Sequence, residues 1–460
     1  MPPKKTKIIL ISLPAPFASE PAMNPPLGLC YISAFLKKHA YQNIQGLDYS
    51  LYKEYDYNKT NYLKKIPLDG NFYGVYSMTC QYYWLKQVIK YIKRKNPKAK
   101  IIVGGPHSST CPEECLRDAG ADIAIKGEGE EAFLEIVSGN NLSKIKGACY
   151  LTKDGNFVES ERAFIKDLDS LPFPDLKVFN IKKYKRTIHH ERALHIVTLR
   201  GCPYSCAFCD KKSVGRNVRY RSVKNVMAEI DSVISEYGIK SFVIYDDIFT
   251  LNRQRAENFC DEFKKRNLKW RCWSRANTID EKILQRMKDS GLVSMTFGIE
   301  SGDDNVLKNI NKQTTYEINK QALSACKKVG IPVRCSLMYG NPGENLKSIK
   351  NTLRLVAETQ PDEWNLAILA PIPGSAIWDN PEKYGVIFNK KWVKKNNYKM
   401  TNRFNESGIG SIWISLRGLS KKEMRKNLDF FVRELEKVCP RKNIQDTIQS
   451  INVKQVKMLK

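Results

Sequence analysis

RGCPYSCAFCD, residues 200–210, places Cys202, Cys206 and Cys209 in a C-x3-C-x2-C pattern on one short segment. Iron–sulfur clusters are held by cysteine thiolates, usually four of them. Three thiolates on a tight loop can hold three irons of a cubane, which leaves the fourth iron open to a substrate or cofactor. A structural zinc site commonly needs a second pair of ligands, and no pair with that spacing lies nearby in the sequence. The pattern therefore favours an open [4Fe–4S] cluster.

This segment resembles the signature of the radical SAM enzymes. In that family the open iron chelates the amino and carboxylate groups of S-adenosylmethionine (SAM). The resemblance also implies that Phe208, which fills the aromatic position before the third cysteine, lies near the adenine.

A series of six strand-and-helix units is predicted from His195 onward. The expected strands are ALHIVTLRG, SFVIYDD, WRCWSRAN, SMTFGIE, VRCSLMYG and EWNLAILAP. This series is similar to the partial (β/α)6 barrel, of TIM type, of radical SAM enzymes. Active sites of such barrels lie at the carboxyl ends of the strands, and the cysteine loop follows the first strand.

Charged residues follow two of these strands. Asp246 and Asp247 match the acidic strand end of the family, where one would receive the SAM amino group; the alternative is a helix N-cap with an acidic first turn. Arg275 ends the third strand and would reach the SAM carboxylate; the alternative is a solvated surface arginine.

Further strand-end fragments, FGIESG, YGNPGE and PIPGS, are typical of the same family. The resemblance implies that Glu300 bonds the ribose hydroxyls or the methionine amine, and it adds four residues to the SAM site. These are Ser301, Gly340, Ala370 and Pro371.

The first 150 residues alternate between predicted strands and helices, which indicates a doubly wound, Rossmann-like α/β domain. IILISL is expected to be a buried first strand rather than part of a signal peptide. PPLGLCYISAFL, VGGPHSS and IKGEGEEAF resemble the cobalamin-binding domain of one class of radical SAM proteins, the class B methyltransferases. The cobalamin residues implied are Ser77, Thr79, Gly104, Gly105, His107, Gly127 and Glu128.

The lower-ligand motif Asp-x-His-x-x-Gly of cobalamin proteins is missing. Asp48 begins the candidate turn, but Ser50 occupies the histidine position. Cobalamin should therefore bind without a protein histidine on cobalt. His107 either replaces that ligand or is a loop histidine that shapes the pocket, and Cys111 and Cys115 are interpreted as structural.

Four regions are expected. They are a cobalamin-binding domain (1–150), a proline-punctuated linker (151–190), a radical SAM core (191–385) and a small, mainly helical C-terminal capping region (386–460).

The composition limits the class of protein. The 460 residues include 13 scattered cysteines, which do not suggest a secreted disulfide framework and fit a reducing cytoplasm. No apolar run is long enough for a membrane span. The net charge of +28 favours an anionic substrate, while nucleic acid is not favoured because no recognition motif accompanies the charge.

The leading functional hypothesis is a cobalamin-dependent radical SAM methyltransferase, which needs a one-electron reductant such as flavodoxin or ferredoxin. The resemblance implies that SAM yields a 5′-deoxyadenosyl radical and that cobalamin delivers a methyl group to an unactivated carbon. The alternatives are a non-methylating cyclase or rearrangement enzyme, a tRNA methylthiotransferase, and a non-enzymatic cobalamin-binding module.

Overall fold

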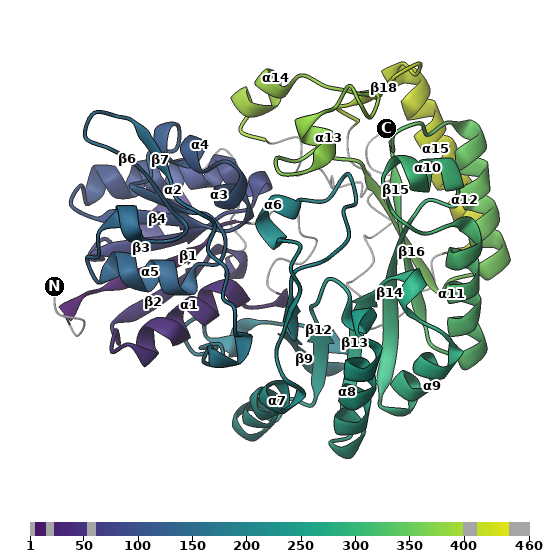
Figure 1. The fold of residues 1–460 in the computed structure, drawn as a ribbon, viewed down its shortest axis with the longest axis horizontal. Helices are drawn as coiled ribbons and strands as arrows, with labels where there is room; N and C mark the ends of the chain where they lie inside the picture. Colours follow the sequence, from purple (N-terminus) through teal and green to yellow (C-terminus); the bar gives the residue numbers. More distant parts are fainter. Residues whose placement is uncertain (1–4, 15–22, 53–60, 399–411, 441–460) are drawn as a thin grey trace. The chain divides into compact units, whose positions relative to one another are not determined.

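The computed structural model describes residues 5–14, 23–52, 61–398 and 412–440. The chain divides into two compact units (Figure 1). Unit 1 comprises Met1–Lys185, Asp210–Val214 and Lys390–Asn402, and unit 2 comprises Arg186–Cys209, Gly215–Asn389 and Arg403–Lys460.

Unit 1 is built on a seven-stranded sheet of order β2-β1-β3-β4-β5-β6-β7. The first five strands are parallel, whereas β6 pairs antiparallel with β5 and β7 pairs antiparallel with β6. Their bounds are β1 (Ile8–Ser12), β2 (Ile44–Asp48), β3 (Phe72–Tyr76), β4 (Lys100–Gly104), β5 (Ile123–Ile125), β6 (Ala148–Leu151) and β7 (Phe157–Glu159). The order 2-1-3-4-5 is that of a doubly wound fold, whose ligands bind beyond the carboxyl ends of the strands.

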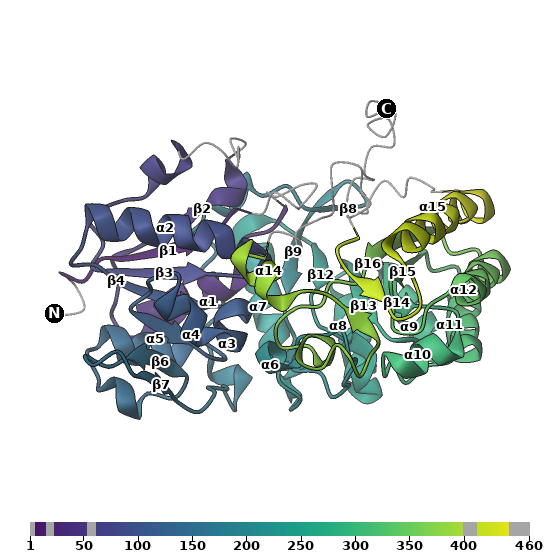
Figure 2. The same cartoon turned by 90° about the horizontal axis from the view of Figure 1, so that it is seen from above.

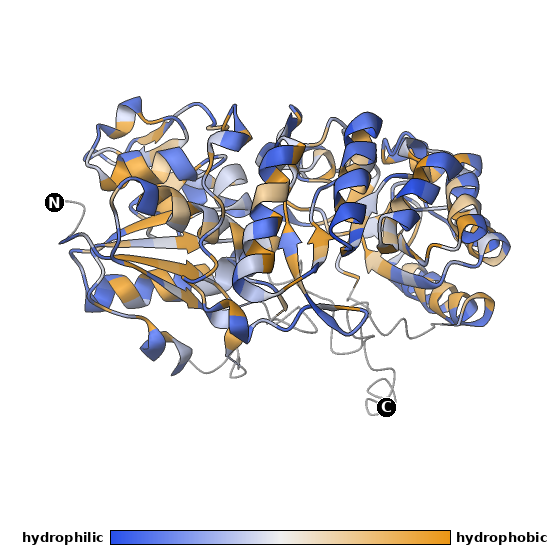
Figure 3. Ribbon diagram, turned by 90° about the horizontal axis from the view of Figure 1, so that it is seen from below, coloured by the Kyte–Doolittle hydropathy of each residue, from blue (hydrophilic) through white to orange (hydrophobic). Residues whose placement is uncertain are grey.

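Strands β1, β4 and β5 of unit 1 are largely apolar and buried, as expected for a sheet that helices cover on both faces (Figure 3). α1 buries Leu29 and Leu36 against this core, and α2 buries Val88 and Ile92. The helices are α1 (Leu27–Lys38), α2 (Tyr82–Lys95), α3 (Pro106–Thr110), α4 (Pro112–Arg117) and α5 (Glu130–Val137). The short helices α6 (Lys211–Val214) and α14 (Lys390–Lys395) also belong to this unit.

Unit 2 is built on a second seven-stranded sheet, of order β16-β15-β14-β13-β12-β9-β8. Six of its strands are parallel and follow one another in sequence, and β8 pairs antiparallel with β9. The bounds are β8 (Thr187–Ile188), β9 (Glu191–Ile196), β12 (Ser241–Ile244), β13 (Lys269–Ser274), β14 (Leu292–Glu300), β15 (Val333–Tyr339) and β16 (Glu363–Ile368).

Helices cover the outer face of this curved sheet (Figure 1). Phe263 of α8 packs edge-on against Trp270 of β13, which marks that face as the helix-covered one. The helices are α7 (Val223–Tyr237), α8 (Arg253–Lys265), α9 (Glu281–Asp289), α10 (Asp304–Asn309), α11 (Tyr316–Val329), α12 (Leu346–Thr359), α13 (Ala376–Asp379) and α15 (Lys421–Val438). α15 lies along α12 (Figure 2), where it buries Met424, Leu428 and Phe431.

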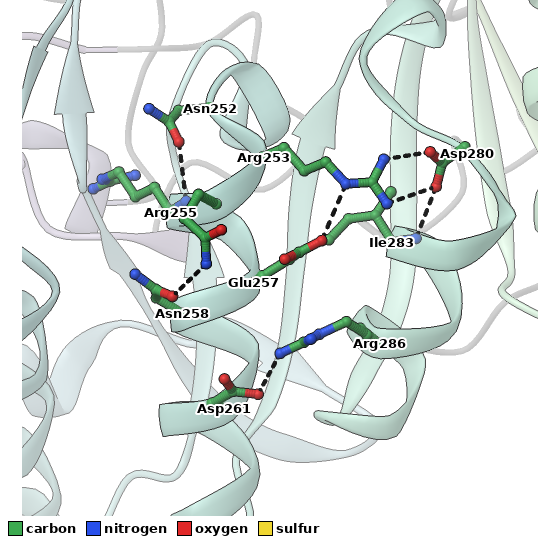
Figure 4. Close-up of polar contacts among 10 residues, drawn as sticks. Asn252, Arg253, Arg255, Glu257, Asn258, Asp261, Asp280, Ile283 and Arg286 are labelled. Carbon is green, nitrogen blue, oxygen red and sulfur yellow. Dashed lines mark hydrogen bonds and ion pairs between the residues drawn. The ribbon is translucent and has the colours of Figure 1, made fainter.

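Exposed charges join α8 to α9 (Figure 4). Arg253 donates to Glu257 over 3.0 Å and to Asp280, which also caps α9 by accepting from the Ile283 amide over 2.9 Å. Two short antiparallel ribbons, β10 (Leu199–Arg200) with β11 (Arg219–Tyr220) and β17 (Val386–Ile387) with β18 (Ser415–Leu416), complete the unit.

The predicted fold class is confirmed: a Rossmann-like sheet precedes a partial barrel with all six predicted strands. The structure adds β2, and it shows that β6 and β7 extend the first sheet although most of their residues fall in the predicted linker. Part of the predicted capping region, residues 399–411 and 441–460, lies outside the described residues. Among the described residues, no helix is both long and apolar enough to cross a membrane.

Candidate active site

The three cysteines of the signature lie on the loop between β10 and β11, at the carboxyl end of the barrel sheet. Cys202 and Cys206 are each 7% exposed, Cys209 is half-buried, and none of the three forms a disulfide. The ribbon closes the base of the loop. Gly201 has a φ of 99°, and a Cβ there would lie 2.3 Å from the Asn217 carbonyl oxygen, so this turn requires glycine.

Backbone hydrogen bonds hold the loop from several directions. The Cys202 amide donates to the Gly215 carbonyl over 3.2 Å, and the Ala207 amide donates to the Ile310 carbonyl over 2.8 Å. The Ile377 amide in turn donates to the Ala207 carbonyl over 3.0 Å. These hydrogen bonds tie the cysteine loop to the segments around it.

Asp246 braces the start of the cysteine loop. Its carboxylate accepts from the Thr198 amide over 2.7 Å, from the Leu199 amide over 3.2 Å and from the Thr198 hydroxyl. The side chain is 3% exposed, and burial raises its pKa to about 6 against the opposing effect of these hydrogen bonds. Asp246 is not a helix N-cap, since Asn252 caps the next α-helix, and its neighbour Asp247 is exposed.

Arg275 lies beside the cluster cysteines. It is 4% exposed, so the surface interpretation is wrong. Its Nη1 lies 3.6 Å from Cys206 Sγ, and its guanidinium carbon lies 3.7 Å from the centre of the Tyr204 ring. Nε and Nη2 are buried without a hydrogen-bond partner among the described residues. Buried cationic donors left open beside the Cys206 thiol fit an anionic group, either the cluster or the SAM carboxylate.

Glu300 ends β14 in the left-handed region, with a φ of 64°. A register shift between Gly298 and Glu300 brings its carboxylate to the Lys312 ammonium, 2.9 Å away, and both side chains are largely buried. Lys312 also lies 5.8 Å from the centre of the Phe208 ring. The structure thus gathers two predicted SAM residues around a lysine.

The remaining predicted SAM residues shape strand ends. Ser301 is fully buried, and its hydroxyl accepts from the Asp303 amide over 3.1 Å. Gly340 has a φ of 86°, and its amide donates to Glu344 over 2.5 Å, where burial raises the pKa of the glutamic acid to about 8. Ala370 and Pro371 follow β16.

The carboxyl edge of the unit 1 sheet is lined by small residues. The buried Ser77 donates its amide to the Gly104 carbonyl over 2.9 Å, and its carbonyl accepts from the His107 amide over 3.1 Å. A Cβ on Gly104 would meet no described atom within 4 Å. One on Gly105, whose φ is 98°, would lie 2.8 Å from the Ser77 carbonyl oxygen. Open space beside a backbone glycine fits a bulky ligand at this edge.

The other predicted cobalamin residues make contacts within unit 1. His107 is fully buried, its Nδ1 lies 3.3 Å from the Thr79 hydroxyl, and burial with the nearby Lys394 lowers its pKa to about 3. Gly127, with a φ of 103°, donates its amide to the Ser109 hydroxyl over 3.0 Å. Glu128 accepts from the Ile165 amide over 2.6 Å.

In the described part of the turn after β2, the polar side chains of the candidate motif bond to one another and to Tyr184. Asp48 is 3% exposed and accepts from the Ser50 amide and hydroxyl over 2.9 and 2.8 Å and from the Tyr184 hydroxyl over 2.6 Å. The Asp48 and Ser50 side chains therefore close the turn, and cobalamin binding without a histidine on cobalt stays a prediction.

Sequence reasoning missed Lys312, Thr198 and Tyr204 as site residues. Lys312 follows a short helix rather than a strand, and only its distance from Glu300 in space reveals it. The aromatic residues Tyr82 and Trp84 of α2 are buried in the core of unit 1, at 0% and 2% exposure.

Two family models match the chain, namely the radical SAM superfamily over residues 196–356 and the B12 binding domain over residues 18–137. An uncharacterized methyltransferase of Pyrococcus horikoshii is 30% identical over 85% of this chain and 86% of its own length. The anaerobic magnesium-protoporphyrin IX monomethyl ester cyclase of Rubrivivax gelatinosus is 27% identical over 77% of this chain and 66% of its own length.

The fold is also that of a solved structure. The radical SAM methyltransferase TsrM from Kitasatospora setae, with tryptophan and a SAM analogue bound, superposes with a TM-score of 0.70 at 17% identity, over 93% of this chain and 89% of that one. Together with the cysteine loop and the glycine-lined edge, these relationships show that the chain belongs to the radical SAM superfamily, among the members that carry an N-terminal B12-binding domain.

Proposed function

We propose that the chain is a cobalamin-dependent radical SAM methyltransferase, which cleaves SAM reductively and methylates an unactivated carbon of its substrate. One observation carries the proposal: a three-cysteine loop beside a buried, partly unpaired arginine occurs in the same chain as a B12-binding fold with a small-residue edge. When bound, the cluster supplies the electron that splits SAM, and cobalamin supplies the methyl group.

The chain's own residues would hold and orient these groups. Cys202, Cys206 and Cys209 are the cluster ligands. The open nitrogens of Arg275 would bind the SAM carboxylate, because a guanidinium pairs with a carboxylate through two parallel hydrogen bonds. Asp246 would act through the loop that it braces rather than on SAM itself.

Glu300 and Phe208 would complete the SAM site as predicted. The Lys312 ammonium holds the Glu300 carboxylate in place, which orients its oxygens toward a ribose or amine partner. We also propose that the predicted cobalamin residues line the cobalamin site of unit 1. They are Ser77, Thr79, Gly104, Gly105, His107, Gly127 and Glu128.

The inner face of the barrel sheet supports an anionic substrate. Tyr245 is 56% exposed and stacks on His195 with ring centres 4.5 Å apart, and Trp273 meets Tyr245 edge-on. Arg271 lies on the same face, at the register of His195, with its buried Nη1 unpartnered among the described residues. Burial and the nearby Arg186 lower the pKa of Arg271 to about 9, so a substrate anion would be stabilised there.

Radical SAM chemistry needs a one-electron reductant, and we propose a flavodoxin or ferredoxin for this role. The basic surface implied by a net charge of +28 suits these acidic carriers.

The test is anaerobic purification, cluster reconstitution and loading with hydroxocobalamin, followed by incubation of the desalted protein with SAM and dithionite. We expect about one corrin per chain, 5′-deoxyadenosine and S-adenosylhomocysteine. Arg275→Lys should raise the KM for SAM by about tenfold, because the paired donors of the guanidinium are lost. Arg286→Gln, which removes an exposed ion pair with Asp261, is the matched control.

The products separate the alternatives. 5′-Deoxyadenosine without S-adenosylhomocysteine from corrin-loaded protein would overturn methyl transfer and favour a cyclase or rearrangement enzyme. No 5′-deoxyadenosine at all, from protein with an intact cluster, would overturn the enzymatic proposal in favour of a cobalamin-binding module.

A further inference from the structure

Three different metal-binding side chains meet where α3 gives way to α4 in unit 1. They are His107, Cys111 and Glu114, which form the pattern H-x3-C-x2-E. A ring nitrogen of His107, the Cys111 sulfur and a Glu114 carboxylate oxygen all lie within 4.8 Å of one another. Cys111 ends α3 and precedes α4 in a non-helical conformation, and this break turns the three side chains toward one point.

The histidine of this cluster is buried with an unused nitrogen. His107 is 0% exposed, and it lies against the rings of Tyr82 and Tyr398 with centres 4.5 and 5.2 Å away. Its Nδ1 faces the Thr79 hydroxyl, whereas Nε2 has no hydrogen-bond partner in the described part of the chain. A buried polar nitrogen without a partner is costly, so a ligand at Nε2 would remove a defect of the fold.

A residue far along the chain orients the carboxylate. The Tyr398 hydroxyl donates to Glu114 Oε2 over 2.7 Å, and Lys394 lies 3.5 Å from the same oxygen. Metal-bound carboxylates are commonly held by such outer hydrogen bonds. Lys394 is half exposed, so its ammonium can turn toward water when a cation binds.

We propose that His107, Cys111 and Glu114 form a binding site for a zinc ion, separate from the iron–sulfur cluster. Zinc takes sulfur, nitrogen and oxygen ligands together, in a tetrahedron that leaves the fourth position here to water. A thiolate and a carboxylate balance the charge of Zn²⁺.

The distances suit zinc after a small adjustment. A point within about 2.8 Å of all three ligand atoms exists when they lie within 4.8 Å of one another, and zinc needs about 2.0–2.3 Å. Rotation of the Cys111 and Glu114 side chains, neither of which is fully buried, covers that difference.

The inference does not depend on the proposed function. It assigns the free nitrogen of His107 to zinc instead of to cobalamin, and the two assignments give different results. If the site binds zinc, replacement of Cys111 should abolish metal binding. If His107 instead contacts cobalamin, corrin binding should survive the loss of the Cys111 thiol.

The test measures zinc on the full chain with its cluster reconstituted, so that the signature cysteines are occupied. Chelator-treated protein is given one equivalent of Zn²⁺, desalted and analysed for zinc and iron by mass spectrometry. We expect about one zinc per chain in the wild type and in Cys115→Ala. Cys115 is the control because it lies in α4, four residues after Cys111. Cys111→Ala and His107→Gln should retain less than about a tenth of it.

A second measurement keeps the proposal falsifiable if a variant folds poorly. In a chain with alanines at Cys202, Cys206 and Cys209 and no corrin, Co²⁺ should give a thiolate-to-cobalt charge-transfer band that disappears with Cys111→Ala. Wild-type protein that retains no zinc, or a Cys111→Ala variant that retains as much as Cys115→Ala, would overturn the proposal. Loss of corrin in His107→Gln but not in Cys111→Ala, with zinc unchanged in both, would assign His107 to cobalamin instead.

Discussion

The carboxyl edges of the two parallel sheets are built in opposite ways. At the barrel edge, buried charged side chains form the site: Asp246 braces the cysteine loop, and Arg275 lies against the Cys206 thiol. At the edge of the unit 1 sheet, backbone glycines carry it, because Gly104 leaves open space and Gly105 lets the chain turn tightly beside Ser77.

This difference follows from the sizes of the expected ligands. A small, charged cluster and the charged end of SAM require fixed polar partners, and these must be desolvated and braced to stay in place. A macrocycle requires room and close backbone approach. Substitutions at the barrel edge should therefore remove interactions, whereas those at the other edge should remove space.

The largest expected effect comes from the cysteine loop. Alanine at any one of Cys202, Cys206 or Cys209 should abolish cluster absorbance and more than about 99% of SAM cleavage, because too few thiolates remain to hold the cubane. Iron content and 5′-deoxyadenosine yield are the measurements. Cys260→Ala, a buried thiol of α8, is the control and should keep both.

The second effect tests the brace. Asp246→Ala should lower the free energy of unfolding by about 2–4 kcal/mol, because the Thr198 and Leu199 amides are left buried without an acceptor. The exposed Asp247→Ala should change it by less than about 0.5 kcal/mol. Equal effects at both positions in urea titrations would show that the brace contributes nothing to stability.

The same carboxylate should give stability a pH dependence. Its folded pKa of about 6 lies above the ordinary carboxyl value of 3.8, so the folded chain holds the extra proton between these values. The stability of the wild type should therefore fall relative to Asp246→Asn as pH rises from about 4 to 6, by up to about 3 kcal/mol, and then stay constant. Urea titrations of the cluster-free full chain at several pH values measure this difference, and parallel profiles would contradict it.

The sequence predicts which segments form the site better than it predicts the contacts between them. The six barrel strands and the cysteine loop could be predicted, since each strand end carries a recognisable fragment. The partner of each charge could not, because Thr198 and Lys312 meet Asp246 and Glu300 only through folding. Likewise, no local pattern joins Tyr398 to Glu114, which lie 284 residues apart in sequence.

Fold prediction failed where strands are short or polar. β2 carries a glycine and a glutamine in five residues, so its periodicity is weak, although it pairs in register with β1. β6 and β7 form an antiparallel hairpin whose turn, residues 152–156, falls inside the predicted linker. Only the pairing of β6 with β5 and of β7 with β6 identifies them as part of the sheet.

The neighbouring glycines of unit 1 offer a sharper test of the comparison. Gly104→Leu should weaken corrin retention by about tenfold with an unchanged melting temperature, since its side chain enters open space. Gly105→Ala should instead cost about 2 kcal/mol of stability, because its φ of 98° strains an L-residue and its Cβ meets the Ser77 oxygen.

Measuring corrin binding and thermal unfolding of both variants distinguishes loss of ligand space at Gly104 from backbone strain at Gly105. If Gly104→Leu kept its corrin while folding normally, the open space would not be the binding surface, and the small-residue edge would be a structural feature alone.

The smallest effect belongs to the exposed charges between α8 and α9 (Figure 4). Arg253 is 44% exposed and pairs with Glu257 and Asp280, and these hydrogen bonds raise its pKa. Because water screens such pairs, Arg253→Gln should cost only about 0.5 kcal/mol, and the loss should shrink further in high salt. Asp280→Ala should still cost about 1 kcal/mol in high salt, since it also removes the cap on the Ile283 amide, and more in low salt, where the pair with Arg253 is less screened. If Arg253→Gln instead cost as much as Asp246→Ala, burial would not be what separates the bracing charges of the barrel edge from the ordinary charges of its surface.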